Sequence, residues 1–88
     1  MTTTPSSAVT MYTTTWCGYC VRLKKMLQRE GISYAEVDIE QDPTAAELVM
    51  QANRGNRIVP TLVFADGSAL TNPSIDQVKA QLGQQAGA

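Results

Sequence analysis

The segment from Ala8 to Ile39 contains a strand pattern, a helix pattern and a second strand pattern, in that order. Ala8–Thr13 (AVTMYT) and Ser33–Ile39 (SYAEVDI) alternate apolar and polar side chains, which is typical of half-buried strands. Between them, Val21–Glu30 (VRLKKMLQRE) has helical spacing, and Gly31 is a suitable C-terminal stop. Because the helix provides the crossover that parallel pairing requires, we expect these two strands to be parallel.

The next part of the chain predicts a helix and a hairpin. Asp42-Pro43 is typical of an N-cap followed by the first helical residue, so we expect a helix over Thr44–Asn53. Thr61–Ala65 and Ser68–Thr71 flank Asp66-Gly67, a strong hairpin signal. These two strands are therefore expected to be antiparallel.

A third helix is expected over Ser74–Leu82, because Asn72-Pro73 repeats the N-cap signature. The predicted order β-α-β-α-β-β-α gives an α/β fold with a four-stranded mixed sheet and helices on both faces. A chain of 88 residues, 43% hydrophobic and 17% charged, suits one domain. We place that domain at residues 8–83, between flexible tails over 1–7 and 84–88.

Composition excludes several classes of function. The net charge of −1 gives no general attraction to nucleic acid or to an anionic membrane, and no apolar run reaches the roughly 18 residues of a membrane span. Without histidine, Ser–His–Asp and Cys–His chemistry and imidazole ligands are excluded. Residues 1–7 lack the basic patch and apolar core of an export signal, so we expect a cytoplasmic protein whose thiols stay reduced.

Two cysteines, Cys17 and Cys20, stand between the first strand and the first helix. At this junction the Cys17 sulfur lies beside unpaired backbone N–H groups and the positive end of the helix dipole, which stabilise a thiolate. Cysteines in redox-active Cys-x-x-Cys motifs commonly have a pKa lowered to roughly 3.5–7.5, and the thiolate is the nucleophile. We expect Cys17 to attack and Cys20, deeper in the first turn, to resolve. The alternative is an inert disulfide or two core cysteines.

Three cations, Arg22, Lys24 and Lys25, follow within two turns of the cysteines. Helix dipoles disfavour cations near the N-terminus, so these residues do not serve helix stability. They form either a solvated helix face or a source of positive potential at the cysteines. Met26, in the same helix, is expected to fill the core.

Two spaced sets of residues resemble the glutaredoxins, which have the thioredoxin fold. They are Tyr12–Cys20 (YTTTWCGYC) and Ile58–Thr61 (IVPT). More narrowly, nearly the whole chain, from Ala8 to Leu82, resembles the actinobacterial mycoredoxins. The runs that match them are Trp16–Lys24 (WCGYCVRLK), Glu36–Glu40 (EVDIE), Gly55–Arg57 (GNR), Phe64–Ser68 (FADGS) and Leu70–Pro73 (LTNP).

The resemblance implies a thioredoxin-like fold and assigns roles to further residues. It implies that Pro60 is cis and faces the cysteines, which leaves the backbone of Val59 free to pair with an extended substrate; the alternative is a strand-initiating proline. By the same analogy, a thiol-binding groove is lined by Trp16, Tyr19, Val59, Pro60, Thr71 and Asn72. Amides from Asn72 to Ser74 are further candidate donors to a polar ligand.

Two positions depart from the glutathione-dependent pattern. Those glutaredoxins usually carry lysine where this chain has Thr14 and proline where it has Gly18. The missing lysine removes a partner for a carboxylate of glutathione. Mycothiol, a sugar-linked thiol, lacks the glycyl and γ-glutamyl carboxylates, so the departure favours mycothiol as co-substrate. No tightly bound cofactor and no metal site are expected.

The function implied by the resemblance is reduction of mycothiol–protein mixed disulfides by a monothiol mechanism through Cys17, with Cys20 as resolving cysteine. The expected partners are mycothiol and mycothiolated or disulfide-containing proteins, a peroxiredoxin being one candidate. We expect a monomer that binds neither nucleic acid nor membranes. Two alternatives remain: a thioredoxin-like dithiol electron donor reduced by a flavoprotein reductase, and an iron–sulfur cluster carrier that bridges two subunits.

Overall fold

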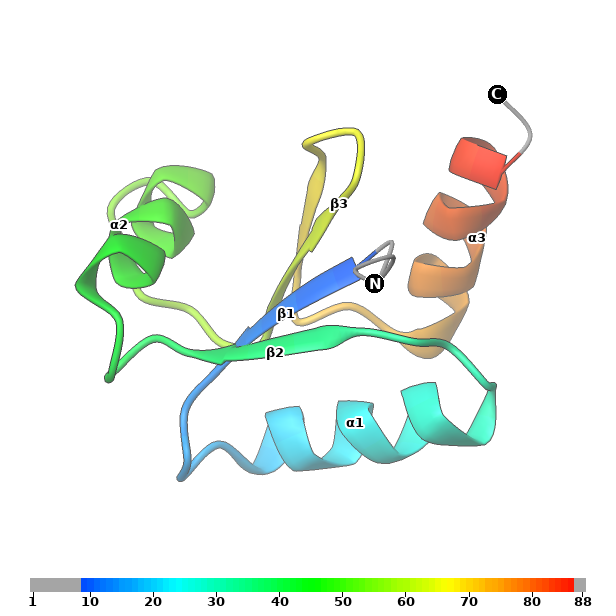
Figure 1. Ribbon diagram of the computed structural model, residues 1–88, viewed down its shortest axis with the longest axis horizontal. Helices are drawn as coiled ribbons and strands as arrows, with labels where there is room; N and C mark the ends of the chain where they lie inside the picture. The colour runs from blue at the N-terminus through cyan, green and yellow to red at the C-terminus, as the bar shows by residue number, and fades with distance from the viewer. Residues whose placement is uncertain (1–8, 87–88) are drawn as a thin grey trace, which may run out of the picture.

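The structure, a computed structural model, describes residues 9–86. Its centre is a four-stranded sheet in the order β2-β1-β3-β4, formed by β1 (Val9–Thr13), β2 (Ala35–Asp38), β3 (Thr61–Phe64) and β4 (Ala69–Thr71) (Figure 1). β1 pairs with β2 in parallel and with β3 antiparallel, and β3 and β4 form the antiparallel hairpin. The predicted mixed sheet and the predicted element order are confirmed.

Three helices cover the two faces of this sheet. α1 (Gly18–Arg29) and α3 (Ile75–Ala86) lie on one face, and α2 (Pro43–Ala52) lies on the other (Figure 1). The fold is thioredoxin-like, as the resemblance implied. Within residues 9–86, no helix combines the length and the apolar composition that crossing a membrane requires.

The larger core lies between the sheet and the α1–α3 layer. Its buried members are Val9, Met11, Cys17, Cys20, Leu23, Leu27, Leu62, Phe64 and Val78. Both cysteines therefore belong to the apolar interior, where close packing fixes side-chain positions.

A smaller core lies between the sheet and α2. It contains Ile39, Ala45, Ala46 and Val49, with Tyr12, Val37 and Val59 packed against it. Two of its four buried residues are alanines, so α2 approaches the sheet through small side chains. Val59 packs against both cores and links the two faces.

The signals for α2, the end of α1 and the hairpin are confirmed. The Asp42 carboxylate accepts hydrogen bonds from the amides of Thr44 and Ala45 at 3.1 and 3.2 Å, as an N-cap should. Gly31 has a φ of +70° after the last turn of α1, and Gly67 has +89° in the hairpin turn. Both positions need the left-handed backbone that glycine adopts without a steric penalty.

The predicted start of the last helix is wrong. Asn72 has a left-handed φ of +45° and lies before the helix, which begins at Ile75. The cap is Ser74: its hydroxyl accepts from the Gln77 amide at 3.1 Å, and the Gln77 side chain accepts from the Ser74 amide at 2.8 Å. This reciprocal pair is a capping box. The helix also continues to Ala86, through part of the segment 84–88 expected as a tail.

α1 begins earlier than its apolar pattern suggested, at Gly18 instead of Val21, because Cys17 is its N-cap. The expected first strand residue, Ala8, and the expected tail over 1–7 lie outside the described residues. The consequence for the site is that Cys17 and Cys20 occupy the cap and the first turn of one helix.

Candidate active site

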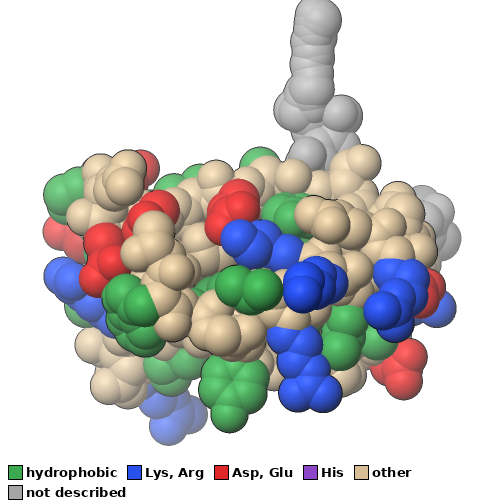
Figure 2. All heavy atoms as spheres, turned by 90° about the horizontal axis from the view of Figure 1, so that it is seen from below, with side chains coloured by type: hydrophobic (Ala, Val, Ile, Leu, Met, Phe, Trp, Pro, Cys, Tyr) green, Lys and Arg blue, Asp and Glu red, His purple; other side chains and the backbone are tan. Residues whose placement is uncertain are grey.

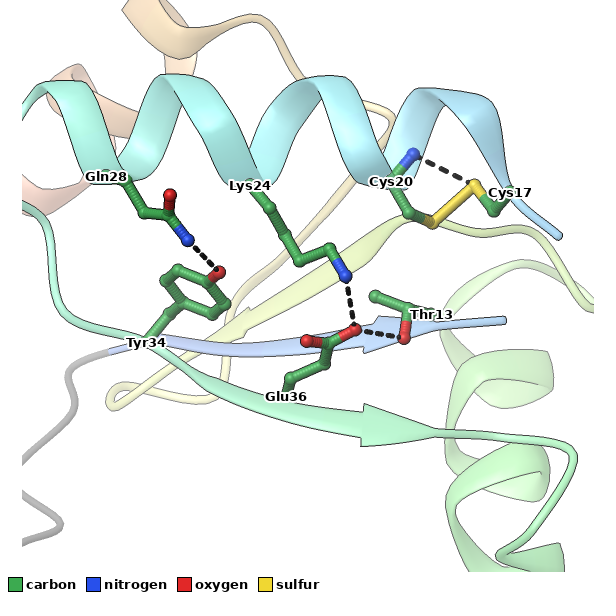
Figure 3. Close-up of polar contacts among 7 residues, drawn as sticks. All are labelled: Thr13, Cys17, Cys20, Lys24, Gln28, Tyr34 and Glu36. Atoms are coloured by element: carbon green, nitrogen blue, oxygen red, sulfur yellow. Dashed lines mark hydrogen bonds and ion pairs between the residues drawn. A yellow bond between two sulfur atoms is a disulfide. The ribbon is translucent and has the colours of Figure 1, made fainter. Parts of the chain in front are cut away.

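Cys17 lies at the N-cap of α1, with an extended backbone (φ −85°, ψ 108°). Its Sγ accepts a hydrogen bond from the Cys20 amide at 3.0 Å (Figure 3). The two cysteines form a disulfide, with their Cα atoms 5.2 Å apart. Cys17 is 5% exposed and Cys20 is 1% exposed, in the order expected for an outer and an inner sulfur.

This placement has a chemical consequence for the reduced pair. A thiolate at Cys17 is a charged acceptor for the same Cys20 amide and lies at the positive end of the α1 dipole. The first turn of α1 holds no acidic residue that would offset the positive partial charge at this end of the helix. Cys20, fixed within that turn, remains close enough to attack a mixed disulfide at Cys17.

The loop before β3 lies beside the cysteines. The Val59–Pro60 peptide bond is cis, as the resemblance implied, and Pro60 is fully buried. Val59 packs against the core cluster that contains both cysteines. Within residues 9–86, the N–H and C=O of Val59 make no backbone hydrogen bond, whereas the Pro60 carbonyl accepts from the Asn72 amide at 2.8 Å.

Asn53, the C-cap of α2, holds this loop through a buried polar network. Its Nδ2 donates to the Val49 carbonyl at 2.8 Å and to the Thr61 hydroxyl at 3.1 Å. The Thr61 hydroxyl donates to the Ile58 carbonyl at 2.6 Å, and the Thr71 hydroxyl donates to Asn53 Oδ1. Thr71, expected to line the groove, thus directs its hydroxyl into the fold.

The two aromatic side chains of the motif are both exposed, at 71% for Trp16 and 64% for Tyr19. Trp16 is tethered to the loop between β2 and α2, because its Nε1 donates to the Glu40 carboxylate at 3.2 Å. Tyr19 instead lines a groove between α1 and the segment that leads into α3. The structure therefore separates these two residues, which were expected to share one groove.

That groove has a volume of about 360 Å³. Its α1 side is lined by Tyr19, Arg22, Leu23 and Met26, and its other side by residues from Asn72 to Ile75. Of the six residues expected to line a groove, this one contains Tyr19 and Asn72. Met26 is half-buried and lines the groove, so the expectation that it fills the core is wrong.

The amides from Asn72 to Ser74 are not free for a ligand, contrary to expectation. The Asn72 amide donates to Pro60, proline at 73 has no N–H, and the Ser74 amide donates to the Gln77 side chain. The capping box and the loop contact use the donors that the sequence suggested for ligand binding.

A second hollow, of about 410 Å³, lies on the opposite side of α1, beside β2. Thr14, Lys24, Glu36 and Asp38 are among its lining residues. Lys24 Nζ and the buried Thr13 hydroxyl donate to Glu36 Oε2 at 3.0 and 2.9 Å (Figure 3). Burial raises the pKa of Glu36, but these hydrogen bonds and the lysine charge outweigh it, and the pKa lies below its ordinary value of 4.5.

Three residues that sequence reasoning missed organise this site: Glu40, Asn53 and Glu36. Each contacts its partner across at least eight positions of sequence, so local patterns carry no signal for them. Gln77 was detectable, because Ser74-x-x-Gln77 is the sequence form of a capping box. Among residues 9–86, no three His, Cys, Asp or Glu side chains gather in a group that could hold a metal ion.

Comparison with known proteins agrees with this geometry. The sequence model of the Glutaredoxin family matches residues 9–69. A Mycobacterium tuberculosis protein named as a glutaredoxin is 60% identical over 82 residues, covering 93% of this chain and 98% of the relative. Mycoredoxin 1 of Corynebacterium glutamicum is 46% identical over 76 residues, covering 86% of this chain and 94% of the relative.

Among solved structures, the glutaredoxin of Methanosarcina mazei superposes with a TM-score of 0.75. It is 24% identical, and the match covers 88% of this chain and 79% of the other. This likeness supports the fold, and the two sequence relatives support the family. The cysteine pair at the start of α1, the family match and these relatives together place the chain in the glutaredoxin family of thiol oxidoreductases, with the mycoredoxins as a similar group.

Proposed function

We propose that this protein reduces mycothiol–protein mixed disulfides in the cytoplasm by a monothiol mechanism through Cys17, with Cys20 as a resolving cysteine. The observation that carries the proposal is the N-cap position of Cys17, whose Sγ accepts a hydrogen bond from the Cys20 amide at 3.0 Å. This position stabilises a thiolate both as nucleophile and as leaving group.

The reaction transfers two electrons in two exchanges. The Cys17 thiolate attacks the mycothiol sulfur of the mixed disulfide, and the protein cysteine leaves as a thiolate. A second mycothiol thiolate then attacks the mycothiol sulfur bound to Cys17, which releases Cys17 and leaves mycothiol disulfide. In the dithiol branch, Cys20 attacks Cys17 Sγ instead, releases mycothiol and forms the Cys17–Cys20 disulfide.

The charge around Thr14 supports mycothiol over glutathione. The hollow beside Thr14 is lined by two carboxylates, Glu36 and Asp38, and by one lysine that is already paired with Glu36. A carboxylate of glutathione would meet net negative charge there, whereas a sugar-linked thiol without carboxylates would not. Similarity to Mycoredoxin 1, whose length is covered to 94% by the match, also supports mycothiol.

The cysteine pair and the cis-proline loop also support the assignment of the site. Val59 and Pro60 lie beside the cysteines, and the Val59 backbone is available to an extended substrate. Tyr19 and Asn72 line the adjoining groove, whereas Trp16 and Thr71 serve the site through their contacts with Glu40 and Asn53.

The test is turnover of one peptide cysteine as its mycothiol mixed disulfide and as its glutathione mixed disulfide, each with the matching thiol as reductant. We expect preference for mycothiol, full loss of activity in Cys17→Ser and retained monothiol activity in Cys20→Ser. Loss of all de-mycothiolating activity in Cys20→Ser would contradict the monothiol mechanism. Preference for glutathione would contradict the proposed thiol.

Inactivity on both mixed disulfides would favour one of the other functions. Direct reduction of the Cys17–Cys20 disulfide by a flavoprotein reductase, without any small thiol, would identify a dithiol electron donor. A brown dimer under anaerobic conditions would identify a cluster carrier.

A further inference from the structure

The cations of α1 divide into two groups with different surroundings. Lys24 faces β2 and pairs with Glu36 at 3.0 Å. Arg22, Lys25 and Arg29 are exposed, and among residues 9–83 they make no ion pair and no side-chain hydrogen bond. Their spacing places them along one face of the helix. Figure 2, which looks onto α1 from below, shows Lys and Arg side chains gathered across the middle of this surface.

Two of these cations, Arg22 and Lys25, gain nothing from the dipole of the helix that carries them. Arg22 and Lys25 lie within the first two turns of α1, near the positive end of its dipole, where cations are unfavourable. The chain as a whole has a net charge of −1, so unpaired positive charge on one helix face is a local feature. Arg29 lies in the last turn of α1, where a cation is favourable. Because Arg22 and Lys25 gain nothing from α1, the part of the face nearest the cysteines is suited to an external anion.

The cationic face adjoins the groove described above. Arg22 lines the groove, and Tyr19, between the two cysteines in sequence, lines the same side. The apolar lining comes from Leu23 and Met26 of α1 and from Ile75 of α3. An apolar side chain can therefore enter the groove while neighbouring carboxylates meet Arg22 and Lys25.

The opposite side of the cysteine pair carries the opposite charge. Trp16 is hydrogen-bonded to Glu40, and Asp38 lines the hollow that also contains Thr14 and Thr15. A partner with acidic residues on one side of its cysteine is attracted to α1 and repelled from this segment. The two surfaces thus favour one orientation of a bound protein segment over its reverse.

We propose that the α1 face formed by Arg22, Lys25 and Arg29, together with the adjoining groove, docks an acidic segment of a protein substrate next to the cysteine that exchanges with Cys17. The inference rests on the proposed function in that the partner is a protein disulfide. It adds the class of partner: a segment in which Asp or Glu residues and an apolar side chain flank the reacting cysteine.

The test uses three synthetic peptides, each with one cysteine held as a mixed disulfide with mycothiol and one leucine beside it. The flanking residues are four Glu, four Gln or four Lys. At low ionic strength we expect kcat/KM to be about tenfold higher for the Glu peptide than for the Lys peptide, and the difference to shrink as salt screens the charges.

Two charge reversals locate the effect on the molecule. Lys25→Glu should remove most of the preference for the Glu peptide. Lys79→Glu, which makes the same change in net charge, should preserve it, because Lys79 pairs with Glu30 at the far end of α1 from Cys17. Lys79→Glu should turn over the Gln peptide at the wild-type rate. The preference of each variant is therefore the ratio of its kcat/KM for the Glu peptide to its kcat/KM for the Gln peptide. Equal kcat/KM for all three peptides, or equal effects of the two reversals, would overturn the proposal.

Binding without chemistry separates this proposal from the proposed function. The Glu peptide with serine in place of cysteine should shift the amide resonances of Tyr19, Arg22 and Lys25 in the oxidised protein, and the Lys peptide should not. This result would stand even if mycothiol mixed disulfides were not turned over, in which case only the proposed function would fail. Displacement of the Glu peptide by equimolar glutathione would instead assign the face to a small anionic thiol and overturn the docking proposal.

Discussion

The two faces of the sheet are built by different means. Among the described residues, nine buried side chains on the α1–α3 face form a continuous core that includes both cysteines. On the α2 face the buried core has four residues, two of them alanines, and Asn53 adds a polar network that reaches β3 and β4. Apolar packing therefore positions the sulfurs, whereas directional hydrogen bonds hold the loop that faces them.

The largest expected effect comes from a substitution in the apolar core on the α1–α3 face. Leu27→Ala should lower the free energy of unfolding by about 2–5 kcal/mol, because Leu27 is fully buried in the larger core. Val49→Ala, equally buried under α2, removes fewer atoms and should cost about 1–3 kcal/mol. Alanine favours helix at both sites, so urea denaturation of the two variants reports packing. A larger loss in Val49→Ala would contradict the ranking of the two cores.

An intermediate effect is expected from the polar network. Asn53→Ala should cost about 1–3 kcal/mol, because it leaves buried hydrogen-bonding groups of Thr61 and Val49 without their partner and removes the part-buried bond from Thr71. It should also raise KM for mixed disulfides, since the Val59–Pro60 loop loses its support. Asn56→Ala is the control, because Asn56 is exposed and its side chain makes one part-buried contact, with the Asn53 carbonyl at 3.2 Å. Equal stability and KM in the two variants would show that the network does not hold the loop.

The smallest effect concerns Glu36. Its folded-state pKa is lower than its ordinary value of 4.5, so its contribution to stability is complete above that value and is lost as pH falls through the lower folded pKa. The pair with Lys24 is partly exposed, so the contribution is about 0.2–1 kcal/mol. Urea denaturation at neutral and acidic pH should show that Glu36→Gln loses less stability on acidification than the wild type. Equal losses of stability on acidification in Glu36→Gln and the wild type would show that Glu36 does not contribute to the pH dependence of stability.

Local signals in the sequence predicted most of the fold. Asp42-Pro43 and Asp66-Gly67 act through hydrogen bonds and backbone angles within a few residues, and the structure confirms both. Asn72-Pro73 carries the same signature as Asp42-Pro43 but fails, because the Asn72 amide is bonded to Pro60 and the chain turns there with a left-handed residue. A tertiary contact thus displaced the cap to Ser74.

The candidate site likewise contains residues that local sequence predicts and contacts that it does not. Cys17 and Cys20 are identifiable from their spacing between a strand and a helix, and their order of burial follows from the helix turn. The partners of the surrounding residues are not identifiable, since Trp16 meets Glu40 and Thr71 meets Asn53 only when distant segments come together. The sequence-based interpretation placed Trp16 and Thr71 in one groove with Tyr19 and Asn72. In the structure, Trp16 bonds to Glu40 and Thr71 bonds to Asn53, and the groove between α1 and the start of α3 contains Tyr19 and Asn72.

The central claim is that the sulfur at the α1 N-cap is the nucleophile. Its most direct test is to treat reduced Cys20→Ser and Cys17→Ser with mycothiol disulfide and to map the adducts by mass spectrometry. We predict that Cys20→Ser gains one mycothiol on Cys17, and that Cys17→Ser is still unmodified when this reaction is complete. Rapid modification of Cys20 in Cys17→Ser, with no adduct on Cys17, would contradict the account.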